Sequence, residues 1–220
     1  MPNIAKSNAV RVVFVRHAET EWNRAGRYQG CIDTHLSQVG RDQASALAER
    51  LRDTEFAAIY SSHMARAVET AEFIAQPRGL PLLQERAFAE VCHGTWEGLT
   101  VEEVEERFPE LVAIRRRTPE HAVAPEGESL FQVRTRALHA FAELLRRHEG
   151  ESLLVVGHDA PTKMILLDAL GLGPESFWKL RFTSTGVSEI IADGPACRIV
   201  QINDIAHLGP NLLTQPHRAL

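Results

Sequence analysis

The chain has 220 residues, enough for one large α/β domain. Its composition, 44% hydrophobic and 24% charged, is that of an ordinary water-soluble globular protein. The formal net charge of −5 argues against a surface for nucleic acid or anionic membranes, although an acidic protein can still carry a local basic pocket for a small anion.

The N-terminal residues and the cysteines indicate a cytoplasmic protein. Residues 1–8 (MPNIAKSN) lack the apolar stretch and cleavage site of a signal peptide, and no apolar run approaches the roughly 20 residues of a membrane helix. Cys31, Cys92 and Cys197 are odd in number and lack the paired spacing of a zinc site or redox motif. We therefore expect three packing cysteines in a reducing compartment.

The first half of the chain alternates short apolar runs with helical patterns. Val10–Val15 is apolar and β-branched, which is typical of a strand buried on both faces. Ser37–Leu51 predicts a helix capped by its first residue, and Ala57–Tyr60 predicts a second strand. A helix is expected from Ser62, and Leu80–Leu83 is expected to form a third strand.

Residues 100–148 are mainly helical in pattern. The segment from Thr100 to Arg117 predicts helical pieces that Pro109 interrupts, and Thr118–Gly127 predicts a loop. Ser129 then opens the longest helix, where it forms a capping box with Gln132.

The last part of the chain returns to strands. Ser152–Val156 predicts a buried strand, and a helix with Pro161 in its first turn follows it and ends near Gly171. Val187–Ala192 and Arg198–Ile202 predict a hairpin around the turn at residues 193–195.

Strands that alternate with helices predict an α/β three-layer sandwich. We expect a mostly parallel central sheet with an antiparallel edge strand and helices on both faces. Residues 1–220 are expected to form a single domain, with a small helical, lid-like insertion at about 93–128.

Three predicted strands end in residues that suit an anion. The first runs into Arg16-His17, the fourth runs into Gly157-His158, and the second leads one helical turn later to Arg66. Ligands of such sheets collect beyond the carboxyl ends of the strands. If the strands are neighbours, two imidazoles and two guanidinium groups face one crevice, an arrangement suited to a phosphate.

The sequence resembles the histidine phosphatase (phosphoglycerate mutase-like) superfamily over nearly its whole length. Residues 15–23 (VRHAETEWN) are similar to the R-H-G-E-T-x-W/x-N signature of that family, except that Ala18 replaces the commoner glycine. The further matching segments, in chain order, are residues 27–30 (RYQG), 60–71 (YSSHMARAVETA), Glu90 with 94–98 (GTWEG), 155–158 (VVGH) and 203–208 (NDIAHL).

The resemblance implies a role for each matching residue. His17 is expected to be the nucleophile and Glu90 the general acid/base; Arg16, Arg66 and His158 bind the phosphoryl group, with Asn23 as a further donor, and Gln29, Gly30 and Asp159 contact the substrate. Guanidinium groups stabilise the equatorial charge of a phosphoryl transition state, and an unprotonated imidazole can attack phosphorus. This chemistry needs neither a metal nor a cofactor.

Several neighbouring residues have two interpretations. Trp96 lines the mouth of the site or is a structural tryptophan. His63 and His93 are expected to be solvated or structural. Arg115-Arg116-Arg117 could reach an anionic substrate from the lid, but such a charge run usually forms a solvated helix face. Asp159 stands where many relatives have glycine; we expect its backbone N–H to serve the helix start, and its carboxylate could contact substrate or a neighbour.

The matching segments favour the phosphatase branch, similar to bacterial α-ribazole phosphatases and broad-specificity phosphatases. Residues 27–30 and 93–99 resemble phosphatases more than mutases. We expect hydrolysis of a small phosphorylated metabolite such as α-ribazole phosphate, phosphoserine or a phosphoglycerate-type acid. A phosphoglycerate mutase, a phosphoprotein phosphatase and a non-catalytic phosphoester-binding protein remain alternatives, and a homodimer is possible.

Overall fold

The computed structural model describes residues 8–194 and 196–213. Its α-helices are α1 (Glu21–Arg24), α2 (Gln38–Arg50), α3 (Ala65–Ala75), α4 (Val101–Arg107), α5 (Pro109–Arg117), α6 (Leu130–Arg147) and α7 (Asp159–Ala169). The strands are β1 (Val10–Arg16), β2 (Ala58–Ser61), β3 (Leu82–Gln84), β4 (Ser152–Gly157), β5 (Val187–Asp193) and β6 (Ala196–Asp204). Short 3₁₀ turns are η1 (Gln76–Arg78), η2 (Arg86–Phe88), η3 (Gly94–Trp96), η4 (Pro119–His121) and η5 (Pro174–Lys179).

Two sequence predictions fall partly or wholly outside these residues. The signal-peptide argument concerns residues 1–8, of which 1–7 are not described, and Pro195 of the predicted hairpin turn is also outside. Within the described ranges, no helix is both long enough and apolar enough to span a membrane.

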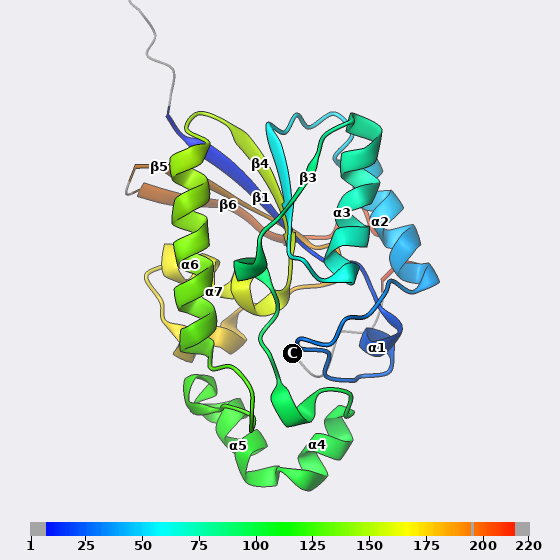
Figure 1. Ribbon diagram of the computed structural model, residues 1–220, viewed down its shortest axis with the longest axis vertical. Helices are drawn as coiled ribbons and strands as arrows, with labels where there is room; N and C mark the ends of the chain where they lie inside the picture. Colours follow the sequence, from blue (N-terminus) through cyan, green and yellow to red (C-terminus); the bar gives the residue numbers. More distant parts are fainter. Residues whose placement is uncertain (1–7, 195, 214–220) are drawn as a thin grey trace, which may run out of the picture.

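All six strands form one sheet in the order β3-β2-β4-β1-β5-β6. β3, β2, β4 and β1 are mutually parallel, β5 is antiparallel to β1, and β6 is antiparallel to β5. Figure 1 shows α6 and α7 on one side of this sheet and α2 and α3 on the other. The predicted three-layer α/β fold and the terminal hairpin are confirmed.

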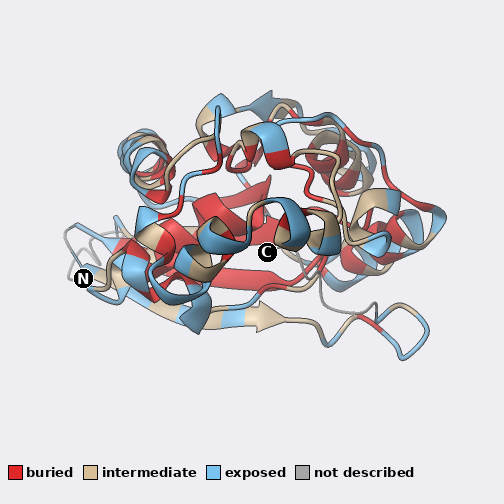
Figure 2. Cartoon of the chain, turned by 90° about the horizontal axis from the view of Figure 1, so that it is seen from below, coloured by how far each residue is buried: buried red, intermediate tan, exposed pale blue. Residues whose placement is uncertain are grey.

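Side chains that alternate along the central strands pack into two separate hydrophobic cores, one on each face of the sheet. Val13 and Val15 of β1 pack with residues of α2 and α3, whereas Val12 and Phe14 pack with residues of α6 and α7. Figure 2 shows the inner strands buried between helices whose outer sides are exposed. Because both faces are covered, these strands are apolar at almost every position.

Local capping chemistry sets the starts of α2 and α6 but not that of α3. Ser37 caps α2 and Ser129 caps α6 in a capping box with Gln132, both as predicted. α3, however, begins at Ala65 rather than at Ser62, and the Asp33 carboxylate accepts the Ala65 N–H at 2.7 Å. The Ser62 hydroxyl is occupied elsewhere, by a contact with His158.

The expected insertion is built from α4 and α5 with the turns η3 and η4. Pro109 starts α5, where its missing N–H costs nothing, and the chain turns between the two helices at Phe108. Figure 1 shows α4 and α5 as a layer beyond the carboxyl ends of the parallel strands.

The prediction that all three cysteines are packing residues is wrong for two of them. Cys31 and Cys92 form a disulfide across 61 residues, whereas Cys197 is free and packs against the core beside α6 and α7. Sequence spacing could not reveal this pair, because only the fold brings the two loops together.

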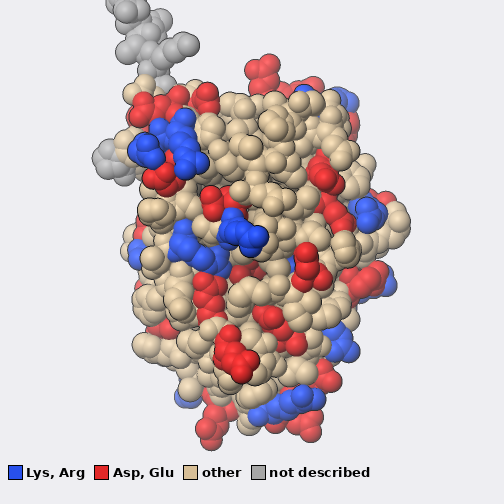
Figure 3. Space-filling view, viewed as in Figure 1, with Lys and Arg blue, Asp and Glu red and all other residues tan. Residues whose placement is uncertain are grey.

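Acidic and basic side chains are interspersed over the face of the molecule shown in Figure 3, which has the orientation of Figure 1. On that face they form no continuous basic stripe of the kind that tracks a nucleic-acid backbone.

Candidate active site

The carboxyl ends of β1 and β4 place the two predicted histidines side by side. Arg16 is in register with Gly157, and the His17 N–H donates to the Gly157 carbonyl at 2.9 Å. The imidazole centroids of His17 and His158 lie 5.1 Å apart, and both residues are buried. The predicted crevice therefore begins with this pair of rings.

Local hydrogen bonds fix the orientation of the His17 ring. Its Nδ1 lies 2.7 Å from the Ala18 carbonyl oxygen, an acceptor, so Nδ1 carries the proton and Nε2 the lone pair. The Ala18 N–H donates to Thr70 Oγ1 of α3 at 3.0 Å, which holds the loop after the strand. Ala18 has no exposed surface, so the site needs a small residue there.

His158 is held as the same Nδ1-protonated tautomer of a neutral ring. Burial, followed by the positive charges of Arg66 and His17, lowers its pKa well below the ordinary value. Ser62 Oγ accepts the Met64 N–H and lies 2.6 Å from His158 Nε2; we assign the hydroxyl as the donor in this contact and Nε2 as the acceptor. The proton of His158 is then on Nδ1, a buried donor with no hydrogen-bond partner among the described residues.

Arg16 and Arg66 are anchored through some of their nitrogens and leave others available. Arg16 Nη1 donates to the Phe182 carbonyl at 2.7 Å, whereas its Nε and Nη2 are buried without a partner in the described part of the chain. Arg66 donates to the carbonyls of Gly30 and Ile32, and its Nε is likewise buried and unpartnered. Burial lowers the pKa of Arg66 to about 10, so it stays charged at neutral pH.

The loop after α1 shapes the wall that holds Arg66. Gly30 has φ +52, and a Cβ there would lie 2.1 Å from Glu97 Oε1, so this position requires glycine. Gln29 is buried, and its Oε1 accepts the hydroxyls of Thr20 and Thr34. The structure thus explains Gln29 and Gly30 as parts of the loop; their contact with substrate stays a prediction.

Asn23 has two functions in the geometry of the loop. Its Oδ1 accepts the Thr20 N–H at 3.0 Å and completes the capping box of α1. Its Nδ2 is buried and has no hydrogen-bond partner among the described residues. Asn23 can therefore cap α1 through its Oδ1 and still offer its Nδ2 as a donor to a phosphoryl group, because the two atoms are opposite ends of one amide.

Glu90 lies in the loop after η2 and is almost fully buried. Its carboxylate accepts the backbone N–H groups of Val91, Asp159 and Ala160 at 2.9–3.2 Å. Burial, and then the negative charge of Asp159, raise the pKa of Glu90. A raised pKa favours the protonated form of a carboxyl group, which is the form that can deliver a proton.

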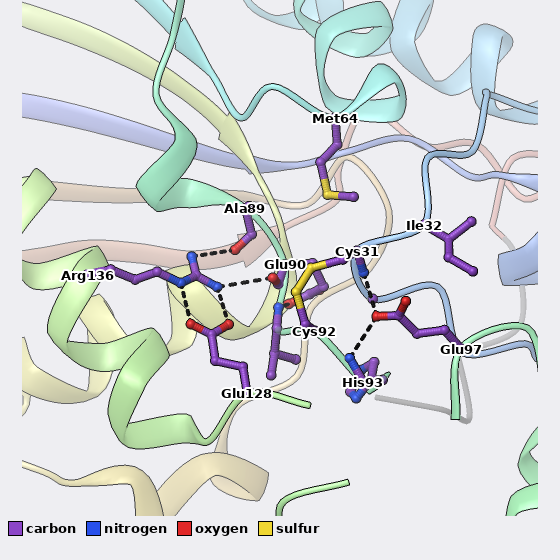
Figure 4. Close-up of a disulfide and its surroundings, with 12 residues drawn as sticks. Cys31, Ile32, Met64, Ala89, Glu90, Cys92, His93, Glu97, Glu128 and Arg136 are labelled. Atoms are coloured by element: carbon purple, nitrogen blue, oxygen red, sulfur yellow. Dashed lines mark hydrogen bonds and ion pairs between the residues drawn. A yellow bond between two sulfur atoms is a disulfide. The ribbon is translucent and has the colours of Figure 1, made fainter. Parts of the chain in front are cut away.

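Arg136 of α6 fixes the backbone of the Glu90 loop. Its guanidinium donates to the carbonyls of Ala87, Ala89 and Glu90 at 2.7–3.0 Å and pairs with Glu128. Figure 4 shows this arginine on the opposite side of the loop from Cys31 and Cys92. Sequence reasoning missed Arg136, because a helix-face arginine carries no signal of the loop it will meet.

Asp159 lies at the start of α7, where its N–H binds Glu90 and its side chain contacts a neighbour; its contact with substrate stays a prediction. Its N–H donates to Glu90 Oε2 at 3.2 Å, and its carboxylate pairs with Lys163 one turn along α7 at 2.6 Å. Both side chains are 2% exposed, and Lys163 Nζ lies 4.2 Å from the centroid of Phe177. The acidic charge is therefore compensated within α7.

The expectation that Arg115-Arg116-Arg117 form a solvated helix face is wrong for Arg115. Its guanidinium lies 5.5–5.8 Å from the ring centroids of Tyr28, Trp96 and Trp178, and its Nη2 is buried without a hydrogen-bond partner in the described ranges. Burial lowers the pKa of Arg115, which the charges of Tyr28, Glu90 and Asp159 partly oppose. It therefore points from α5 toward the site.

The structure gives Trp96 and His93 packing roles, and it leaves His63 partly exposed. Trp96 is 1% exposed and packs with Tyr28 and Val104, which supports the structural interpretation. His93 is buried against the edge of Tyr28, at 5.0 Å between centroids, and is structural rather than solvated. Burial lowers the pKa of His63, which is half-buried.

These groups together define the class of site. The His17 and His158 rings lie side by side, Arg66 and Arg16 are near enough to lower the pKa of His158, and Glu90 accepts N–H groups from the start of α7. Uncommitted guanidinium and imidazole N–H groups in a buried pocket bind a compact oxyanion such as a phosphoryl group. Fold and site define an α/β protein with two buried histidines and two buried arginines near the carboxyl ends of its parallel strands, an arrangement suited to a phosphoryl group.

A family model narrows this class. The model of the histidine phosphatase superfamily (branch 1) matches residues 12–205, so the chain belongs to that family. It is 35% identical over 211 residues to phosphoserine phosphatase 1 of Hydrogenobacter thermophilus, covering 96% of this chain and 100% of that protein. It is 36% identical over 165 residues to the metal-independent phosphoserine phosphatase of Arabidopsis thaliana, covering 74% and 69%.

Solved structures agree with the fold and with the predicted branch. The YhfR protein of Bacillus stearothermophilus superposes with a TM-score of 0.86 at 33% identity, covering 90% of this chain and 98% of that one. The α-ribazole phosphatase of Shigella flexneri gives 0.81 at 26% identity, covering 88% and 96%. The chain is a phosphoric monoester hydrolase of the histidine phosphatase superfamily.

Proposed function

We propose that the protein hydrolyses a small phosphomonoester without a metal, through a phosphohistidine on His17. The observation that carries the proposal is the set of buried donors on Arg16, Arg66 and His158 that have no partner among the described residues, at the place where His158 lies beside the His17 ring. They can bind the equatorial oxygens of a phosphoryl group while His17 Nε2 attacks in line. The name of the metal-independent plant relative supports the absence of a metal from the reaction.

In the first step, His17 Nε2 forms a bond to phosphorus while the ester P–O bond breaks. Glu90, whose pKa is raised, gives its proton to the leaving oxygen. The Ala18 carbonyl accepts from Nδ1–H and stabilises the positive charge that develops on the ring.

In the second step, Glu90 takes a proton from water, and the water oxygen attacks phosphorus. The P–N bond breaks, and its electrons return to Nε2 of His17. Inorganic phosphate leaves, and Glu90 is protonated again for the next cycle. Asn23 Nδ2 is a fourth buried donor for the phosphoryl oxygens.

We further propose that α4 and α5 cover the leaving group, which then lies between Glu90 and Arg115. The cluster of Arg115, Lys163 and Asp159 carries one surplus positive charge, which suits a leaving group with a carboxylate. The phosphoserine phosphatase names of the relatives support O-phosphoserine as the first ester to test.

The mechanism is tested by following phosphate release from p-nitrophenyl phosphate in EDTA. Activity should persist, and rapid quenching should trap an acid-labile phosphoenzyme that is absent from His17→Ala. The matched control is His63→Ala, outside the pocket chemistry, which should still form the phosphoenzyme. Strict dependence on Mg²⁺, or a phosphoenzyme that survives in His17→Ala, would contradict the proposal.

A further inference from the structure

The disulfide joins two loops that carry different parts of the site. Cys31 is exposed and Cys92 is half-buried, so a small thiol or disulfide reagent can reach the pair. Figure 4 shows the bond between the loop after α1 and the loop that carries Glu90, with Met64 of the α3 start nearby. It does not belong to the catalytic chemistry described above.

On its first side, the bond holds the residues that orient Arg66. Cys31 lies between Gly30 and Ile32, whose carbonyls accept from Arg66 Nη2 at 2.9 Å and from Nη1 at 3.0 Å. A shift of Cys31 therefore moves both acceptors at once. These two bonds fix the guanidinium of Arg66, whose Nε is buried without a hydrogen-bond partner in the described part of the chain.

On its second side, the bond holds the loop of the general acid. Cys92 follows Glu90 by two residues, and its carbonyl accepts the Glu128 N–H at 2.8 Å. Arg136 holds the same loop from the opposite side through the Glu90 carbonyl. The disulfide thus fixes the position of the acid relative to that of the phosphate-binding arginine.

We propose that Cys31 and Cys92 form a reversible redox site that sets the activity of the enzyme. The disulfide holds Arg66 and Glu90 at fixed positions relative to each other, and its reduction lets those positions vary. The proposal rests on the proposed function of these two residues. Oxidation removes one hydrogen from each thiol and transfers two electrons to a low-molecular-weight disulfide, which leaves as two thiols. Reduction by a dithiol reverses the exchange through a mixed disulfide.

A second link between the loops keeps the reduced site partly assembled. Glu97 Oε1 accepts the N–H groups of Cys31 and His93, each at 2.8 Å. These bonds do not depend on the state of the sulfurs. Reduction should therefore weaken catalysis without abolishing it.

The experiment uses the full chain carrying Cys197→Ser, which removes the third thiol while leaving the pair intact. The protein is reduced with dithiothreitol or oxidised with its cyclic disulfide, in EDTA for the main series and with Zn²⁺ in place of EDTA for a parallel series, and thiols are counted by alkylation and mass spectrometry. Oxidation should remove two thiols and give a cross-linked peptide pair. Reduction should lower kcat/KM for p-nitrophenyl phosphate about tenfold, because small displacements of positioned groups are costly.

Orthovanadate affinity, measured by calorimetry, provides a readout that needs no turnover. It should weaken on reduction in parallel with kcat/KM. If neither state hydrolyses phosphoesters but vanadate affinity still follows the thiol count, the proposed function fails and the redox site stands.

The matched control is the double variant Cys31→Ser and Cys92→Ser in the same background. It should have the activity of the reduced protein and ignore both reagents. Equal kcat/KM in the two states, despite a change of two thiols, would overturn the proposal. So would inhibition on reduction that appears only with Zn²⁺ and is reversed by EDTA, since that would indicate metal binding by Cys31, Cys92 and Glu97.

Discussion

Glu90 and Asp159 are neighbouring buried carboxyl groups with opposite surroundings. Lys163 compensates Asp159 directly at 2.6 Å, whereas the hydrogen bonds that Glu90 accepts from the described residues come from backbone N–H groups. The negative charge of Asp159 helps to raise the pKa of Glu90, while Arg66 and Arg16 oppose that rise. A carboxyl group with a raised pKa beside a second one that pairs with a cation is an arrangement typical of acid catalysis by carboxyl pairs.

Replacing Asp159 by Asn should change the pH dependence of the enzyme. The acid step needs protonated Glu90, so hydrolysis of an ester with a poor leaving group falls as pH rises through the raised pKa of Glu90. Asp159→Asn removes a negative charge and leaves Lys163 uncompensated, and both changes lower that pKa. The alkaline limb of kcat/KM for an alkyl phosphate should therefore move to lower pH.

The control for this prediction is Asp168→Asn, on the same helix, whose carboxylate pairs with Arg134 at the surface. Asp168→Asn should leave the pH dependence of kcat/KM for the alkyl phosphate unchanged. p-Nitrophenyl phosphate should show the smaller change in Asp159→Asn, because its leaving group needs little protonation. An alkaline limb that stays where it is in Asp159→Asn would contradict the electrostatic role.

At the scale of elements, α5 directs three consecutive arginines to different surroundings. Arg115 lies over Tyr28, Trp96 and Trp178, and its carbonyl accepts from Trp178 Nε1 at 2.7 Å. Arg116 contacts Glu105, and Arg117 donates to the Ala113 carbonyl on the exposed face. Helical geometry separates neighbouring side chains by about 100° (3.6 residues per turn), so only one of the three can face the site.

Arg115→Gln should therefore impair hydrolysis of carboxylate-bearing esters selectively. Loss of a charge-assisted hydrogen bond of about 1.5 to 3 kcal/mol should lower kcat/KM for O-phosphoserine roughly 10- to 100-fold. Phosphoethanolamine, which lacks the carboxylate, should change by no more than about threefold on the same reasoning. Steady-state kinetics on the two esters measure the difference.

Arg117→Gln supplies the comparison, since it removes a charge from the same helix turn without facing the site. The kcat/KM of Arg117→Gln for both esters should equal that of the unmodified chain. An equal loss of kcat/KM for O-phosphoserine and phosphoethanolamine in Arg115→Gln would contradict recognition of the carboxylate. It would indicate that Arg115 supports the packing of α4 and α5 instead.

At the scale of the whole molecule, the sheet supports the site from two independent cores. Leu154, at the centre of β4, has no exposed surface and packs with the α2 and α3 layer. Leu153, next to it, packs with the α6 and α7 layer. β4 thus carries His158 on a strand that is fixed from both sides.

Leu154→Ala should destabilise the protein by about 2 to 5 kcal/mol, since it leaves a cavity in a fully packed layer. Urea denaturation at constant redox conditions measures the change. Leu170→Ala, at a residue that is 48% exposed, should cost less than about 0.5 kcal/mol. Equal costs for the two substitutions would mean that the α2 and α3 layer can collapse around the loss.

Much of this architecture could be predicted because it depends on local patterns. The apolar run of β1 and the caps at Ser37 and Ser129 depend on neighbours within a few residues of the chain. The start of α3 was misplaced at Ser62, because the hydroxyl that could have capped it binds His158, which is 96 residues away. Long-range competition of this kind is absent from any local pattern.

The sequence by itself determined the order of the elements, the two strand-end histidines and the family whose motifs Arg16, His17, Arg66, Glu90 and His158 follow. Only the tertiary structure decided that Asp159 pairs with Lys163, that Arg115 turns inward and that Cys31 meets Cys92. The reason is physical. Hydrophobic periodicity and capping act along the chain, whereas burial, charge compensation and sulfur pairing depend on distances that exist only after β1, β4 and their loops have been brought together.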